Sequence, residues 1–244
     1  MAAMLTLTNC TEQIDAPVEP AKVPFEIIAS TVETKTAAGD NLSTVWTEGD
    51  ALNVFHVFAG NEGYQNDGKF VLTGDNTFKG ELSGTFEDED CYNWYALYPY
   101  NKNVTTPANT GDKGYVTVGS GASASQIQTG NNSMSHIAGP NYPLAGVAED
   151  VEYYAGDPLE INMSHLSSLL EVVVKNNTGK ELTVESVSFT GTEDVIGTYY
   201  IDFTGVAPVF TKSGDKFVAN VAKLDVKAGE AIPDGETATF YLAI

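Results

Sequence analysis

The sequence predicts an all-β protein with two β-sandwich domains, and three observations support this fold class. Short apolar segments alternate with turn signals rich in Gly, Asn and Asp, at residues 66–68, 176–179 and 213–215. The composition of 23 Gly, 12 Tyr and 11 Phe favours strands joined by tight turns. No long run of residues carries the apolar stripe of an amphipathic helix.

The expected strands follow one another from residue 24 to the end of the sequence. Residues 52–58 are apolar on both faces, which is typical of a strand in a sheet covered on both sides. Residues 101–132 are polar and rich in Gly, Ser and Thr, and we expect one short strand in this stretch. The predicted strands are residues 24–31, 52–58, 69–73, 82–86, 91–98, 115–118, 159–163, 169–175, 182–189, 196–203, 217–221 and 237–244.

These strands suggest three parts in the chain. Residues 1–23 are predicted to be a signal-peptide remnant, a lipobox and a Pro-containing tether. Residues 24–156 form the expected N-terminal sandwich and residues 157–244 the second one. The sequence stops within the apolar run 240–244, so we expect the second sandwich to be truncated at its C-terminus.

Cys10 is the predicted lipidation site, because residues 7–10 (L-T-N-C) resemble a lipobox in which this cysteine is acylated after cleavage. Asn9 departs from the small residue usual before that cysteine. Two alternatives stay open: Cys10 lies in a frayed leader and has no role, or it forms a disulfide with Cys91. Without that disulfide, Cys91 is expected to be a buried, inert thiol.

Charge excludes some classes of partner. The chain has 33 acidic and 12 basic residues, all of the basic ones lysine, for a net charge of -21. Such a charge repels phosphate backbones, so we expect no nucleic-acid partner and no electrostatic docking on anionic lipid. The acidity is interpreted as a solvated exterior.

No pattern indicates an enzyme, a metal site or a cofactor. The histidines are far apart in sequence, and His56 on an apolar strand is interpreted as a hydrogen-bonded core residue. The acidic run 87–90 lacks the spacing of a calcium loop and is expected to be a solvated turn. Ser213 and Lys216 match a Ser-x-x-Lys pattern, but its companion motifs are missing, so we attribute the match to chance.

Aromatic residues offer two interpretations. Trp46, just before a Gly-Asp turn, is expected to anchor the core rather than to form a ligand loop. A second aromatic group could form a sugar-stacking platform, although alternation along the strand places part of it in the core. Its members are Tyr92, Trp94, Tyr95, Tyr98 and Tyr100, and the pairs Tyr153–Tyr154 and Tyr199–Tyr200 are similarly ambiguous.

Several weak motifs occur together in one order. They are T-K-T at 34–36, V-W-T-E-G-D-A-L-N-V-F at 45–55, F-K-G at 78–80, Y-A-L-Y-P-Y at 95–100, S-Q-I-Q at 125–128, I-N-M-S-H-L-S-S-L-L at 161–170 and I-G at 196–197. In this order the chain resembles the fimbrillin-like family of anaerobic Gram-negative bacteria, from residue 25 onward.

The resemblance implies two transthyretin-like, Greek-key β-sandwiches in a lipoprotein exported to the outer membrane and cell surface. It also implies a pilus (fimbria) subunit or adhesin that is not an enzyme and whose partners are other subunits. A protease removes the first strand, here residues 24–31, and a segment of another subunit fills the exposed groove. Cys10 matches the acylated cysteine. Lys22 and Val23 flank the one basic site just before that strand, which makes them the expected cleavage site.

The resemblance leaves the position in a pilus open between shaft, tip and anchor, and it names no receptor. The alternative function is an outer-membrane glycan-binding lipoprotein of a polysaccharide-uptake system, with the aromatic platform as its site.

Overall fold

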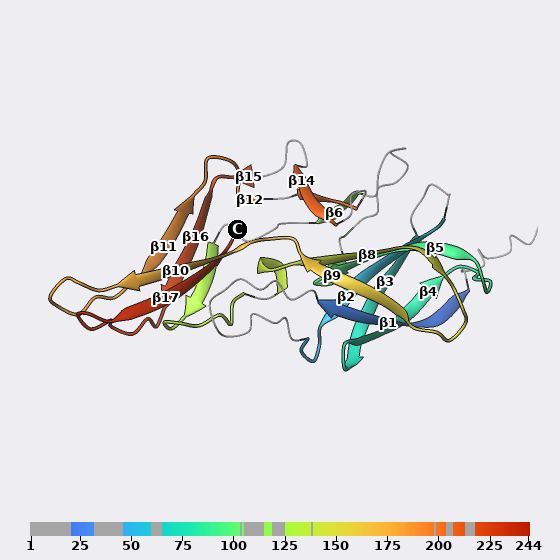
Figure 1. The fold of residues 1–244 in the computed structure, drawn as a ribbon, viewed down its shortest axis with the longest axis horizontal. Helices are drawn as coiled ribbons and strands as arrows, with labels where there is room; N and C mark the ends of the chain where they lie inside the picture. The colour runs from blue at the N-terminus through green and yellow to red at the C-terminus, as the bar shows by residue number, and fades with distance from the viewer. Residues whose placement is uncertain are drawn as a thin grey trace, which may run out of the picture.

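The computed structural model describes residues 21–31, 46–59, 65–102, 104, 115–118, 125–137, 139–197, 199–203, 207–212 and 218–244. The predicted leader, lipobox and most of the tether, including Cys10, lie outside these residues. So do Ser213 and Lys216. The described elements are all strands apart from one short 3-10 helix, Gly139–Asn141, so the all-β prediction is confirmed (Figure 1).

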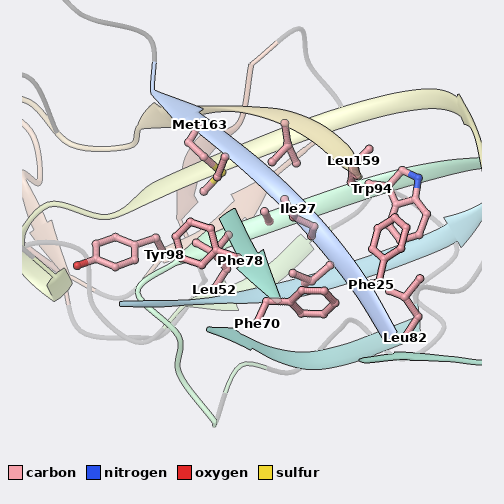
Figure 2. Close-up of a cluster of buried hydrophobic side chains, with 14 of the residues drawn as sticks. Phe25, Ile27, Leu52, Phe70, Phe78, Leu82, Trp94, Tyr98, Leu159 and Met163 are labelled. Atoms are coloured by element: carbon pink, nitrogen blue, oxygen red, sulfur yellow. The ribbon is translucent and has the colours of Figure 1, made fainter. Parts of the chain in front are cut away.

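A closed seven-stranded ring occupies one end of the elongated molecule (Figure 1). Its strands hydrogen-bond in the order β1-β4-β3-β2-β5-β8-β9, and β9 returns to β1. Their bounds are β1 (Lys22–Thr31), β2 (Ala51–Phe58), β3 (Gln65–Gly74), β4 (Thr77–Ser83), β5 (Cys91–Tyr98), β8 (Leu144–Glu152) and β9 (Leu159–His165). The interior of this barrel is filled by apolar side chains from every strand, as Figure 2 shows around Phe70, Phe78 and Trp94.

A small sheet covers the outer face of the barrel at β2, β5 and β8. It consists of β6 (Tyr115–Val118), β13 (Tyr199–Asp202) and β14 (Val209–Lys212), in the order β14-β13-β6. Ile201 and Phe203 pack against Phe55, Tyr95 and other outward residues of the barrel, forming a second core. This explains why β2 is apolar on both faces, and the prediction of a doubly covered strand at 52–58 is confirmed.

The other end of the molecule is a small sandwich. A three-stranded sheet, β11 (Ser186–Thr190), β16 (Val221–Lys227) and β7 (Ser125–Thr129), faces a two-stranded sheet, β10 (Leu169–Lys175) and β17 (Thr237–Ala243). A further pair, β12 (Ile196–Gly197) and β15 (Val218–Ala219), lies beside them. Leu224 of β16 and Phe240 and Leu242 of β17 are fully buried between the sheets.

Two strands pair across the division predicted at residue 157. β9, assigned from sequence to the second sandwich, pairs with β1 and β8 of the barrel. β7, assigned to the first, pairs in parallel with β16 of the second unit. The sequence predicted neither β7 nor β8. Gly146 interrupts the apolar pattern of β8, yet a Cβ there would lie 2.7 Å from the Asn162 carbonyl oxygen, so glycine fits this close approach.

Candidate functional site: the strand that closes the barrel

Strand β1 is the element that turns an open sheet into a barrel. Its residues Lys22 to Ile28 pair antiparallel with β4, while Ile27 to Thr31 pair in parallel with β9. The first half of β1 therefore uses one neighbour and the second half uses the other, with an overlap at Ile27 and Ile28. Without β1, the edges of β4 and β9 would both be left without a partner.

Alternate side chains of β1 fill the barrel interior. Phe25, Ile27 and Ala29 are 7%, 0% and 0% exposed, whereas Ile28 between them is half-buried on the outer side. Figure 2 shows β1 crossing the core with Phe25 and Ile27 pointing into it. This period of two lets one strand supply a row of apolar groups and a row of backbone hydrogen bonds together.

Phe25, the first inward residue of β1, packs among aromatic rings. The Phe25 ring stacks on Trp94, with centroids 5.1 Å apart, and lies 6.0 Å from Tyr153. Gly80 is paired with Phe25 across the ladder, and a Cβ at Gly80 would come within 2.6 Å of the Phe70 ring. In this pair, the Trp94 ring packs on Phe25 and the Phe70 ring packs on Gly80.

Trp46 closes the space beside Ala29. Its Nε1–H donates to the Ala29 carbonyl oxygen at 3.0 Å, and its ring meets Phe78 and Tyr98 edge-on, with centroids 5.0 and 5.2 Å away. Trp46 packs against the barrel core, as predicted from sequence. Its indole therefore links the backbone of β1 at this point to the aromatic rings of the barrel core.

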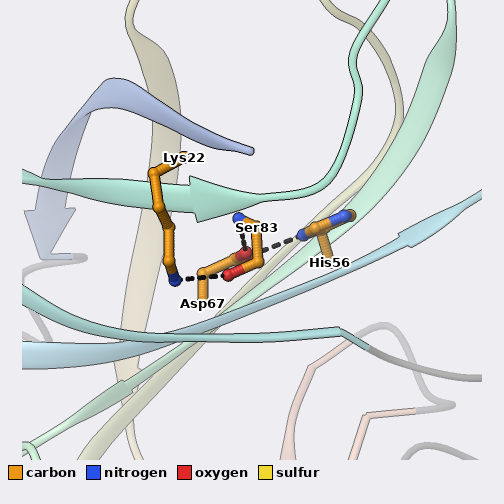
Figure 3. A network of polar contacts seen from close by, with 4 residues as sticks. All are labelled: Lys22, His56, Asp67 and Ser83. Atoms are coloured by element: carbon orange, nitrogen blue, oxygen red, sulfur yellow. Dashed lines mark hydrogen bonds and ion pairs between the residues drawn. The ribbon is translucent and has the colours of Figure 1, made fainter. Parts of the chain in front are cut away.

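A polar network holds the opposite end of β1, where the strand begins (Figure 3). Lys22 Nζ donates to Ser83 Oγ at 2.7 Å, and the Ser83 N–H donates to Asp67 Oδ1 at 2.8 Å. Asp67 Oδ2 lies 2.6 Å from His56 Nδ1, and the Asp67 side chain is fully buried. A buried carboxylate is stable only when paired and hydrogen-bonded, and these contacts meet that need.

His56 is thus a hydrogen-bonded core residue, as predicted. Rings of Phe86, Tyr92 and Trp94 surround its imidazole at centroid distances of 4.9 to 5.7 Å. Its partner, Asp67, was not predicted from the sequence. The residue that faces His56 in the β2–β3 ladder is Gln65, whereas Asp67 falls at the register shift between the Val54–Gly68 and Phe55–Asn66 pairs. Simple strand alternation does not place such an unpaired residue, so the sequence offered no signal for this contact.

The predicted cleavage residues lie inside β1. Lys22 and Val23 pair with Ser83 and Leu82, and Val23 packs against the barrel core. A cut between them would leave residues 23–31 in the ring. Cys91, at the start of β5, is half-buried and not buried as expected. The alternative in which it pairs with Cys10 stays open, because Cys10 lies outside the described residues.

The aromatic platform proposed for sugar stacking is wrong for most of its members. Tyr92, Trp94, Tyr95 and Tyr98 are between 1% and 9% exposed and belong to the two barrel cores. Burial, aided by Asp90, raises the pKa of Tyr92 to about 12, so its hydroxyl stays neutral. Each face of β5 packs on its own core because the outer sheet covers the face that would otherwise meet solvent.

Tyr153 also lies in the barrel core, whereas Tyr154 is 40% exposed and donates its hydroxyl to Glu152 Oε2. Among the described residues, no cluster of three His, Cys, Asp or Glu side chains could hold a metal ion. Within that part of the chain, no helix is long and apolar enough to span a membrane.

Comparison with known proteins yields structural matches only. No family model matches the chain, and no curated protein matches it. A crystal structure described as "a putative cell adhesion protein" from Bacteroides ovatus matches with a TM-score of 0.58 and 16% identity, covering 91% of this chain and 78% of that one. The two proteins share a fold.

Two further structures match less closely. One, with the same description but from Bacteroides uniformis, has a TM-score of 0.47 and 14% identity, covering 91% of this chain and 73% of its own. A fimbrial assembly protein from Parabacteroides distasonis has a TM-score of 0.32 and 12% identity, covering 82% and 88%. At such identities the likeness concerns the fold alone.

Proposed function

We propose that this chain is a fimbrillin-like surface protein, a pilus subunit or adhesin, that joins other subunits by exchange of strand β1. The observation that carries the proposal is the position of β1, which pairs with β4 over one half and with β9 over the other while three of its side chains fill the core. An extended segment of another subunit with the same alternation could replace it, since the ladder provides affinity and the inward positions provide register.

The fold likeness to a Bacteroides structure with an adhesion description supports this role. In keeping with the resemblance, we propose export as a lipoprotein acylated at Cys10 and display on the outer membrane and cell surface. The role is non-enzymatic. The glycan-binding alternative lacks support, because Trp94 of the predicted aromatic platform is only 1% exposed and cannot stack on a sugar.

Release of β1 requires a cut after Thr31, the last residue of the strand. The first basic residue beyond it is Lys35. We therefore propose Lys35 as the maturation position for a lysine-directed protease, in preference to Lys22, whose cleavage leaves the inward residues of β1 in place.

Strand exchange can be tested by replacing residues 34–36 with the site of a sequence-specific protease. After cleavage, a fluorescent peptide of residues 21–31 should enter the protein and displace the original strand, and native mass spectrometry would count one peptide per chain. The same peptide with Ile27→Asp should fail to enter, because it would bury a charge at a fully buried position. Uncut protein is the control.

Strand exchange would be contradicted by a cleaved protein that keeps its own β1 and takes up no peptide just below its unfolding temperature. Lipidation is tested separately in cells that express the native gene. Cys10→Ser should abolish incorporation of labelled fatty acid and shift the protein from the membrane fraction to the soluble one.

A further inference from the structure

The two-stranded sheet of the second unit has one closed edge and one open edge. The closed edge belongs to β17. Thr239, Tyr241 and Ala243 direct their backbone groups away from β10, and side chains take the place of a neighbouring strand there. The N–H groups of these residues donate to Asn132 Oδ1, Gln128 Oε1 and Gln126 Oε1 at 2.7, 3.0 and 3.0 Å.

Their carbonyl oxygens are occupied as well. Gln128 Nε2 donates to Thr239 at 3.2 Å and Gln126 Nε2 to Ala243 at 2.7 Å, while His136 Nε2 lies 2.8 Å from the Tyr241 carbonyl oxygen. Both glutamines are at most 1% exposed. No incoming strand can pair with β17 without displacing these buried amides.

The open edge belongs to β10. Bonds between Ser168 and Ile244 and between Asn176 and Glu236 fix the phase of the β10–β17 ladder, so the even-numbered residues of β10 bond to β17. The backbone groups of Leu169, Glu171, Val173 and Lys175 therefore face outward. Within the described part of the chain, no strand pairs with this side of β10.

The side chains on this edge are exposed and complementary to themselves. Val173 is 58% exposed, and Glu171 and Lys175 beside it are exposed too. In an antiparallel pairing of two β10 strands centred on Val173, Glu171 of each copy lies opposite Lys175 of the other. A shift of the register by two residues in either direction removes both opposite-charge pairs. A shift by four residues places Glu171 opposite Glu171, or Lys175 opposite Lys175, of the other copy.

We propose that two copies of this chain associate through the open edge of β10, forming a continuous four-stranded sheet β17-β10-β10-β17 about a two-fold axis at Val173. The outward backbone groups of residues 171, 173 and 175 fall in hydrogen-bonded pairs in this register. Valines at 172 and 174, whose side chains lie half-buried on the inner face, meet their counterparts there. The contact is isologous and closes as a dimer.

This interface is separate from strand exchange at β1 and does not depend on it. Each copy carries a net charge of -21, so long-range repulsion opposes the dimer. We expect the dimer to strengthen when salt is raised from low to physiological concentration, because screening shortens that repulsion to about 8 Å.

The test is sedimentation equilibrium on the full chain over protein concentrations up to about 1 mM, a range that detects even weak association. The wild type should approach twice the 26.0 kDa of one chain. Lys175→Glu sets two pairs of like charges across the interface and should weaken the dimer about tenfold. Lys180→Glu changes the net charge equally from an exposed position outside β10, and it should leave association nearly unchanged.

Restoring the charge pattern identifies the register. The double change Glu171→Lys with Lys175→Glu re-creates both opposite-charge pairs and should recover wild-type association. Val173→Pro removes an outward N–H that the monomer does not use, so it should leave thermal stability nearly intact and weaken the dimer at least about tenfold.

A wild type that stays monomeric throughout the concentration range overturns the proposal. So does a dimer that withstands both Lys175→Glu and Val173→Pro, because it must then use another surface. Failure of the double charge reversal to restore association overturns the antiparallel register centred on Val173.

Discussion

The barrel and the small sandwich protect their sheet edges in different ways. The barrel closes its ring with one strand, β1, whose pairing partners β4 and β9 are far from each other in sequence. In the sandwich, side chains of Gln126, Gln128, Asn132 and His136 satisfy the edge of β17. A strand can leave as one piece and be replaced by another, whereas buried amides anchored in β7 cannot. If both proposals hold, strand exchange takes place in the barrel, and the sandwich associates through the open edge of β10 while its β17 edge stays closed.

The largest expected effect comes from truncating the closing strand. Ile27→Ala removes a fully buried side chain from β1 and should lower the free energy of unfolding by about 2–5 kcal/mol. Ile28→Ala removes the same atoms from the half-buried outer side and should cost much less. Chemical denaturation of both variants provides the comparison. Equal losses would show that β1 does not fill the core as described.

The second effect concerns the amides that close β17. Gln128→Ala leaves the N–H of Tyr241 without its acceptor and removes a donor from the carbonyl oxygens of Thr239 and Gly130. A buried unsatisfied group costs about 1–3 kcal/mol, and the variant should lose stability in that range. Gln65→Ala, at an exposed site at the start of β3, is the control. Hydrogen exchange should speed up at the Tyr241 amide, and unchanged protection there would contradict the amide closure.

Acidification should act on the junction between the two units. Burial lowers the pKa of His165 to about 4, and its ring stacks on Tyr142 with centroids 3.9 Å apart. Because the folded-state pKa lies below the ordinary 6.5, the unfolded chain binds the proton more readily. The stability contributed by neutral His165 is complete above pH 6.5 and declines as pH falls from there towards 4.

His165→Phe keeps a ring at this position and removes the titration. The unfolding temperature, measured from pH 7 to pH 4, should therefore fall less steeply in the variant than in the wild type. Carboxyl groups titrate over the same range in both proteins, so only the difference between the two curves reports on His165. Parallel curves would show that His165 does not couple protonation to folding.

Local patterns in the sequence were sufficient to predict individual strands and the burial of single residues on them. The apolar alternation of residues 52–58 implied a strand covered on both faces, and an imidazole on that strand implied a buried partner. Gln126 and Gln128 could not be interpreted in this way. They lie in a polar, Ser-rich stretch, and the β17 groups that they bind are more than a hundred residues away in sequence. The same holds for the parallel pairing of Ile27 with Leu159, since no local signal selects a partner so distant.

The smallest expected effect concerns the C-terminal end of β1, where Trp46 donates to the backbone. Trp46→Phe retains an aromatic ring near Phe78 and Tyr98 but loses the hydrogen bond to the Ala29 carbonyl oxygen. A single neutral hydrogen bond contributes about 0.5–1.5 kcal/mol, so global stability should fall by roughly that amount. If β1 leaves the barrel as a unit, the same variant should also accelerate peptide exchange in the cleaved protein, by about tenfold for each 1.4 kcal/mol lost. A loss of stability without faster exchange would mean that Trp46 supports the core and not the hold on β1.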